Sequence, residues 1–170
     1  MNSWSAVPVA LLLGAAVAPL PAQAQHRHGA VRLEIAVEAA SLDVALDAPL
    51  DALLGFERAP RTAAERAQVD AMFAALKAVP PPLAAPGCTL QSAEAASDVV
   101  KPGAKAAEHA DLQARWRFAC RDAASLRALD IGVLMKAFPR IAQVEADVAT
   151  ASGQFRVALK RPATELRWGR

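Results

Sequence analysis

The sequence predicts an α+β domain, built as an antiparallel sheet of about six strands with two or three helices packed on one face. Two observations predict this class. Several runs alternate apolar and polar residues with a period of two, as half-buried strands do. Between them lie helical patterns, one of which starts with a capping box and ends at three prolines. The chain has 170 residues, which is enough for one such domain.

The first two strands form a predicted hairpin. Alternation runs through residues 31–37 and again through residues 42–46, and only about four residues separate the two runs. Such a short connection favours antiparallel pairing of neighbouring strands. A single helical turn over residues 49–54 is expected to follow, starting at Pro49.

The most regular helical pattern starts at Thr62. The segment from Thr62 to Glu65 fits a capping box, in which a hydroxyl and a carboxylate each accept a hydrogen bond from a backbone N–H. Apolar side chains then recur at helical spacing, at Val69, Met72, Phe73 and Leu76. The helix is expected to stop before Pro80, the first of three consecutive prolines.

The second half of the chain alternates strands with short helices. A brief strand over residues 88–90 precedes residues 91–110, which lack apolar periodicity and predict a flexible excursion. The remaining predicted elements are a strong strand over 112–120, a helix over 123–130 capped by Asp122, a short helix over 131–138, a hairpin of strands 142–148 and 155–159, and an edge strand at Leu166 and Trp168.

The start of the chain has the pattern of a secretory signal peptide. No charged side chain precedes Arg27, and residues 6–20 are nearly all apolar. This run is too short to span a bilayer but fits the hydrophobic region of a signal peptide. Ala22-Gln23-Ala24 predicts cleavage after Ala24. We expect residues 1–24 to be removed and 25–170 to form a single soluble, exported domain, the alternative being an uncleaved core helix.

The predicted export indicates the oxidation state of the two cysteines. In an oxidising compartment a lone pair of cysteines usually forms a disulfide, here between Cys88 and Cys120. Two buried free thiols or a redox pair are the alternatives. The wide spacing and the absence of a C-x-x-C motif disfavour redox chemistry.

Several function classes are disfavoured. A net charge of +2 is too small for a nucleic-acid binder, which needs a basic surplus to neutralise phosphates. The sequence contains none of the common nucleophile, phosphate-binding, dinucleotide-binding or zinc-protease motifs. We therefore expect neither an enzyme nor a nucleic-acid partner, and no stable membrane insertion after signal cleavage.

The histidines are the candidate metal ligands. His26 and His28 are two residues apart, so in an extended segment both imidazoles project from one side. Zinc prefers four ligands, or three and a water. The further ligands could be Glu108, His109 and Asp111, at the end of the excursion. They would converge if the strand over 112–120 paired beside the first strand; otherwise these residues are a solvated tail and a loop.

These motifs occur together in a recognisable order. They are His26-Arg27-His28-Gly29, the strand over 31–37, the segment Leu53–Thr62, the two cysteines, and Phe138-Pro139 before the last hairpin. This order resembles the ZrgA-like periplasmic zinc-binding proteins of Gram-negative bacteria, long catalogued as a domain of unknown function. The resemblance covers essentially the whole mature chain, and Gly-Phe-Glu-Arg-Ala-Pro-Arg-Thr at residues 55–62 is its most specific part.

The resemblance implies a periplasmic accessory protein of zinc acquisition, which assists delivery to a zinc importer. In that family the excursion carries a long run rich in His, Asp and Glu that binds several zinc ions. Here residues 91–111 retain Glu94, Asp98, Glu108, His109 and Asp111. One weak zinc site at most is then expected, at His26, His28 and His109 with Glu108 or Asp111. The alternative is a metal-independent periplasmic interaction module that has lost its metal-binding tract.

Overall fold

The computed structural model describes residues 28–78, 87–98, 100 and 110–169. The predicted signal peptide, its cleavage site and the middle of the predicted excursion lie outside these residues. All the statements below concern the described part of the chain.

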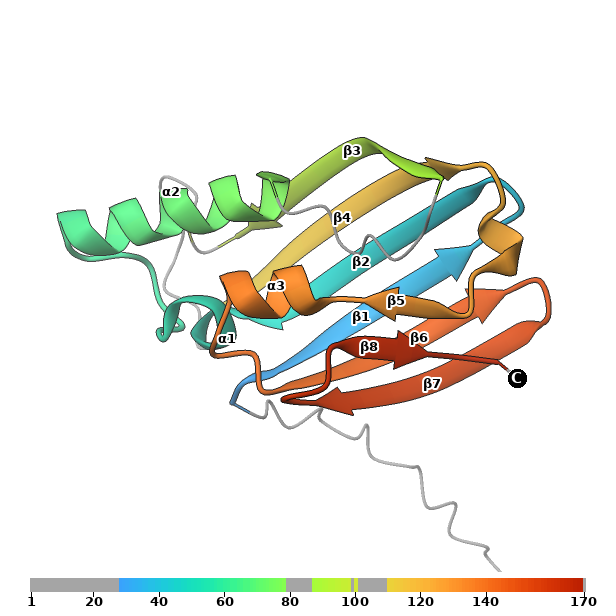
Figure 1. Ribbon diagram of the computed structural model, residues 1–170. Coiled ribbons are helices and arrows are strands. Elements are labelled where there is room, and N and C mark those ends of the chain that lie inside the picture. The colour runs from blue at the N-terminus through green and yellow to red at the C-terminus, as the bar shows by residue number, and fades with distance from the viewer. Residues whose placement is uncertain (1–27, 79–86, 99, 101–109, 170) are drawn as a thin grey trace, which may run out of the picture.

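A six-stranded sheet forms the centre of the fold (Figure 1), in the order β3-β4-β2-β1-β6-β7. Its strands are β1 (Ala30–Val37), β2 (Ser41–Pro49), β3 (Cys88–Ser97), β4 (Asp111–Cys120), β6 (Gln143–Thr150) and β7 (Gly153–Lys160). Neighbouring strands are antiparallel except β1 and β6, which are parallel. The predicted α+β class and the mainly antiparallel sheet are therefore confirmed.

The smaller elements gather on one side of this sheet. They are α1 (Leu50–Leu54), α2 (Ala63–Ala78), the 3₁₀ turn η1 (Ala123–Ser125), β5 (Ala128–Asp130), α3 (Gly132–Ala137) and β8 (Glu165–Arg167). Strands β5 and β8 pair with each other as a second, two-stranded sheet. In Figure 1 they cross in front of the large sheet together with α3, while α1 and α2 lie towards one end. The opposite face of the sheet carries no described helix.

The core lies between the sheet and these smaller elements. Side chains of β1 alternate between the two faces of the sheet. Leu33 and Ile35 point into the core, whereas Arg32 lies on the open face. Trp116 of β4 is fully buried, and its indole N–H donates a hydrogen bond to the backbone oxygen of Leu76 at 2.9 Å. This bond ties α2 to the sheet and satisfies the polar atom of the largest core side chain.

Strand β3 is longer than predicted. The excursion was expected to begin at residue 91, but β3 continues to Ser97. The register between β3 and β4 shifts between Leu90 and Ser92, so one residue bulges and the inward-facing parity changes along the strand. Beyond the bulge the half-buried residues are alanines, Ala93 and Ala95, which give little apolar signal.

The predicted helix over 123–130 is wrong. Asp122 does cap a turn, since its carboxylate accepts a hydrogen bond from the N–H of Ser125. The turn ends there, because the chain next enters β5, where Leu129 pairs with Leu166 of β8. Pairing between distant segments has overridden the local helical pattern. The following short helix is confirmed as α3.

The condition for convergence of the candidate ligands, pairing of the strand over 112–120 with the first strand, is not met. The strand over 112–120, β4, pairs with β2 from Asp111, opposite Pro49, to Ala119, opposite Ser41. Strand β2 therefore separates β4 from β1. The disulfide, in contrast, is confirmed: Cys88 at the start of β3 is joined to Cys120 at the end of β4, directly opposite it.

Candidate metal centre

One end of the sheet brings together the start of β1, the end of β2 and the start of β4. His28 lies just before β1, Asp51 lies just after β2 in the first turn of α1, and Asp111 is the first residue of β4. The backbone N–H of Leu50 donates to the oxygen of Ala110 at 2.8 Å, which fixes α1 beside the start of β4. Two of the candidate ligands predicted from the sequence, His28 and Asp111, therefore lie at this end of the sheet.

His28 and Asp51 form the polar contact at this end. His28 Nδ1 lies 2.5 Å from Oδ2 of Asp51. The His28 side chain is 90% exposed, whereas the Asp51 side chain is only 16% exposed. The second oxygen of Asp51, Oδ1, is buried and has no hydrogen-bond partner among the described residues. An exposed imidazole is therefore held by a carboxylate that is itself mostly covered.

The surroundings of His28 favour its charged form. The hydrogen bond to Asp51 and the negative charge of that carboxylate raise the pKa of His28 above its ordinary 6.5. The charge of Glu57, in the loop after α1, acts in the same direction. A cation at this position, whether a proton or a metal ion, is thus stabilised by nearby carboxylates.

Two glycines with positive φ, which favours glycine, flank the pair, and Arg140 packs on both. Gly29 has φ of 73°, and a Cβ there would lie 2.8 Å from the backbone oxygen of Arg140. Gly55, which ends α1 with φ of 86°, would place a Cβ 2.7 Å from the guanidinium carbon of the same arginine. Close approach by Arg140 therefore accounts for glycine beside His28 and for the glycine that opens the 55–62 motif.

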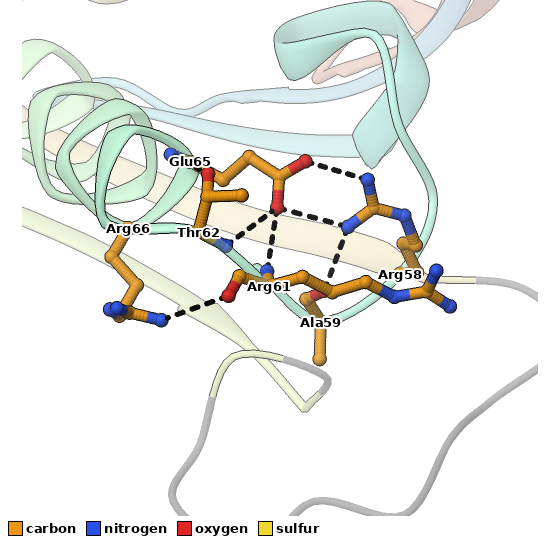
Figure 2. Close-up of polar contacts among 6 residues, drawn as sticks. All are labelled: Arg58, Ala59, Arg61, Thr62, Glu65 and Arg66. Atoms are coloured by element: carbon orange, nitrogen blue, oxygen red, sulfur yellow. Dashed lines mark hydrogen bonds and ion pairs between the residues drawn. The ribbon is translucent and has the colours of Figure 1, made fainter.

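The rest of that motif holds the loop between α1 and α2 (Figure 2). The Glu65 carboxylate accepts hydrogen bonds from the Arg58 guanidinium at 2.6 and 3.1 Å, and from the backbone N–H groups of Arg61 and Thr62 at 2.6 and 3.1 Å. The Thr62 hydroxyl completes the predicted capping box by accepting from the N–H of Glu65 at 3.1 Å. The hydrogen bonds that its carboxylate accepts from Arg58 and from the two backbone N–H groups lower the pKa of Glu65 to about 2, with the Arg58 hydrogen bond as the largest cause.

Arg58 also packs over an aromatic ring of the same motif. Its guanidinium carbon lies 5.2 Å from the centre of the Phe56 ring, within the range of a cation–π contact. Arg58 therefore contacts Phe56 near the start of the loop and Glu65 just after its end. Glu57 lies between Phe56 and Arg58 in the sequence. The most specific segment of the sequence thus builds a fixed loop, which carries one of the carboxylates that act on His28.

The structure describes two of the five predicted ligands, His28 and Asp111. His26, Glu108 and His109 lie outside the described residues. Asp111 is exposed and shares the end of the sheet with His28, but the hydrogen-bond partner of His28 is Asp51. Within the described residues, no group of three or more His, Cys, Asp or Glu side chains is placed to hold a metal ion.

Asp51 is the residue that sequence reasoning missed, and a signal for it was present. Arg32 of β1 pairs with Asp47 of β2 in the hairpin. Counting four residues back from Arg32 and four forward from Asp47 leads to His28 and Asp51. Extending the register of this hairpin therefore places the two residues opposite each other.

A hollow on the open face of the sheet is a second place where a ligand could bind. Its volume is about 750 Å³. Two of the arginines that line it are paired with carboxylates, Arg117 with Asp43 and Arg156 with Asp147, each at 2.8 Å. Asp147 is also paired with Arg32 at 2.7 Å, so two arginines, Arg32 and Arg156, share this carboxylate. The two arginines also hold the pKa of Asp147 below its ordinary value. This pattern is typical of a solvated, ion-paired sheet face, so the end of the sheet is the better candidate site.

The fold and site together define a small α+β domain with an exposed histidine held by a carboxylate at one end of its sheet. The sequence matches the ZrgA family, described as zinc uptake proteins, over residues 25–168, and the chain belongs to this family. No curated protein matches the chain. Among the described residues, no helix is both long enough and apolar enough to cross a membrane.

Proposed function

We propose that this chain is a periplasmic zinc-binding accessory protein of zinc uptake, which holds at most one zinc ion at a site that includes His28. Membership of a zinc uptake family supports the metal and the process. The observation that carries the site is the His28 imidazole, 90% exposed and 2.5 Å from the Asp51 carboxylate, at the end of the sheet where Asp111 also lies.

The chemistry of these groups suits zinc. A neutral imidazole nitrogen is the commonest protein ligand for such metals, and carboxylate oxygens complete many zinc sites. Asp111 is the described carboxylate that we assign to this role, and His26, Glu108 and His109 are the further ligands that the sequence offers. We also propose that the ion passes to a periplasmic component of a zinc importer, and that the chain binds it without catalysing a reaction.

Zinc titration calorimetry on the mature chain from Gln25, after stripping with a chelator, tests this proposal. At pH 7.5 we expect one saturable site per chain, which His28→Ala removes. At pH 5.5 we expect an affinity at least about tenfold weaker, because the raised pKa of His28 leaves it protonated there and a proton must leave before zinc can bind.

A matched control separates a lost ligand from a damaged fold. Asp70→Ala removes an exposed carboxylate on α2, far along the chain from the site, and should leave the titration unchanged. Thermal unfolding should show that His28→Ala and Asp70→Ala are equally stable within error. A flat wild-type titration at both pH values would contradict the proposal and favour the metal-independent interaction module.

A further inference from the structure

The two ring nitrogens of His28 have different surroundings. Nδ1 lies within hydrogen-bond distance of Asp51, and Asp51 is the polar partner that His28 has among the described residues. With a side chain that is 90% exposed, the other nitrogen, Nε2, is left without a protein partner there. The ring is therefore held at one nitrogen and open at the other.

We propose that Asp51 is a positioning residue, which fixes the neutral His28 ring with its proton on Nδ1 and so leaves Nε2 as the zinc donor. This inference rests on the proposed function. An ionised carboxylate can only accept hydrogen bonds, so a contact of 2.5 Å requires the hydrogen on Nδ1. A neutral imidazole carries one N–H and one lone pair, and the lone pair must then be on Nε2.

Asp51 is itself held firmly enough for this role. The N–H of Gly55 donates to the Asp51 backbone oxygen at 2.9 Å and closes the single turn of α1. The residues on either side of Asp51, Leu50 and Ala52, are fully buried. Only 16% of the Asp51 side chain is exposed, and its Oδ2 lies within hydrogen-bond distance of His28.

The backbone beside His28 is also anchored. The oxygen of Gly29 accepts hydrogen bonds from the N–H groups of Ala142 and Gln143, at 2.8 and 3.1 Å. Both partners are therefore attached to the sheet, and the ring needs little reorganisation to present Nε2 to an ion. Carboxylates that orient ligating histidines in this way are worth about 10- to 100-fold in metal affinity.

A bare surface ion pair is the competing interpretation. Such a pair contributes little to stability and sets no preference between the two neutral tautomers once the charge on the ring is lost. The two interpretations therefore differ in a quantity that can be measured without any metal, namely which nitrogen of the neutral His28 ring carries the proton.

Nitrogen-15 NMR of the imidazole groups of the metal-free mature chain measures this directly. At alkaline pH, where His28 is neutral, we expect a protonated Nδ1 and an unprotonated Nε2. Asp51→Ala should release this preference, whereas Asp51→Asn keeps an acceptor oxygen of the same shape and should largely retain it. The three histidines in the chain make assignment of the His28 signals by His28→Gln practical.

Zinc affinity is the second readout. Asp51→Ala should weaken zinc binding by about 10- to 100-fold, and Asp70→Ala should not change it. An Nε2-protonated wild-type ring, or an Asp51→Ala chain with unchanged tautomer and affinity, would overturn the positioning role while leaving the zinc site intact. Absence of zinc binding to the wild type would overturn both the proposed function and the assignment of Nε2 as zinc donor.

Discussion

At the scale of single residues, Glu65 links acid sensitivity to the loop beside the candidate site. Its pKa is lowered from an ordinary 4.5 to about 2 by Arg58 and by two backbone N–H groups. A carboxyl group with a depressed pKa in the folded state contributes stability that is complete above about pH 4.5 and is lost as the pH falls through about 2.

Glu65→Gln should therefore lower the free energy of unfolding at pH 7, because the amide accepts capping hydrogen bonds but cannot pair with the Arg58 charge. The deficit should shrink between pH 4.5 and 2, as the wild type loses the same interaction. Urea unfolding at pH 7, 4.5, 3 and 2 measures it, with Asp70→Asn on the same helix as control. A deficit that stays constant over this range would contradict the assignment of the lowered pKa to Glu65.

The residue scale also shows where sequence reasoning succeeds and where it stops. The capping box of Thr62 and Glu65 was predictable, because its spacing is local and its chemistry is fixed. The Arg58 contact was not, since it depends on how the loop folds back after the left-handed turn at Gly55. Asp51 was not among the predicted ligands, although the hairpin register leads from His28 to it.

At the scale of elements, the disulfide holds edge strand β3 against β4. The two cysteines are 32 residues apart, and closing a loop of that length stabilises the folded state by on the order of 4 kcal/mol in the chain-entropy estimate. We expect the double variant Cys88→Ser with Cys120→Ser to lose about this much in urea unfolding.

The loss should be concentrated in one part of the sheet. Hydrogen exchange should show faster exchange of the β3 amides after the double substitution, while β1 and β2, which pair with each other, stay protected. Reduced wild-type protein provides the matched comparison, since it lacks the bond but keeps both sulfur atoms. A loss below about 1 kcal/mol would show that β3 is held mainly by its hydrogen bonds to β4.

Elements were predictable where the local pattern and the final fold agree. Strands β1, β2 and β4 alternate regularly, because a single face of each is buried. Most of β3 was missed, because a bulge breaks its period and alanine supplies its inward face. The segment after Asp122 was expected to be a helix, and its pairing with Leu166, more than thirty residues later, could not be read from local pattern.

At the scale of the whole molecule, the predicted export determines the compartment in which the candidate metal site would bind its ion. Protein expressed in a Gram-negative host should be recovered from the periplasm with an intact mass that corresponds to a chain starting at Gln25. Ala24→Phe should block cleavage by removing the small residue at the expected site, whereas Ala10→Val keeps the hydrophobic run and should be processed normally. A full-length wild-type chain in the cytoplasm would contradict the predicted signal peptide.

The parallel pairing of β1 with β6 has a consequence for how fast the protein folds. Ala30 pairs with Gln143, roughly 110 residues further along the chain. Contacts of such long sequence separation raise the contact order, and domains with many of them fold in milliseconds to seconds rather than microseconds. Strand β1 keeps one unpaired edge until the β6–β7 hairpin has been synthesised. A nascent chain with this topology cannot complete its sheet until β6 has been synthesised, a delay that is compatible with the predicted export of the chain.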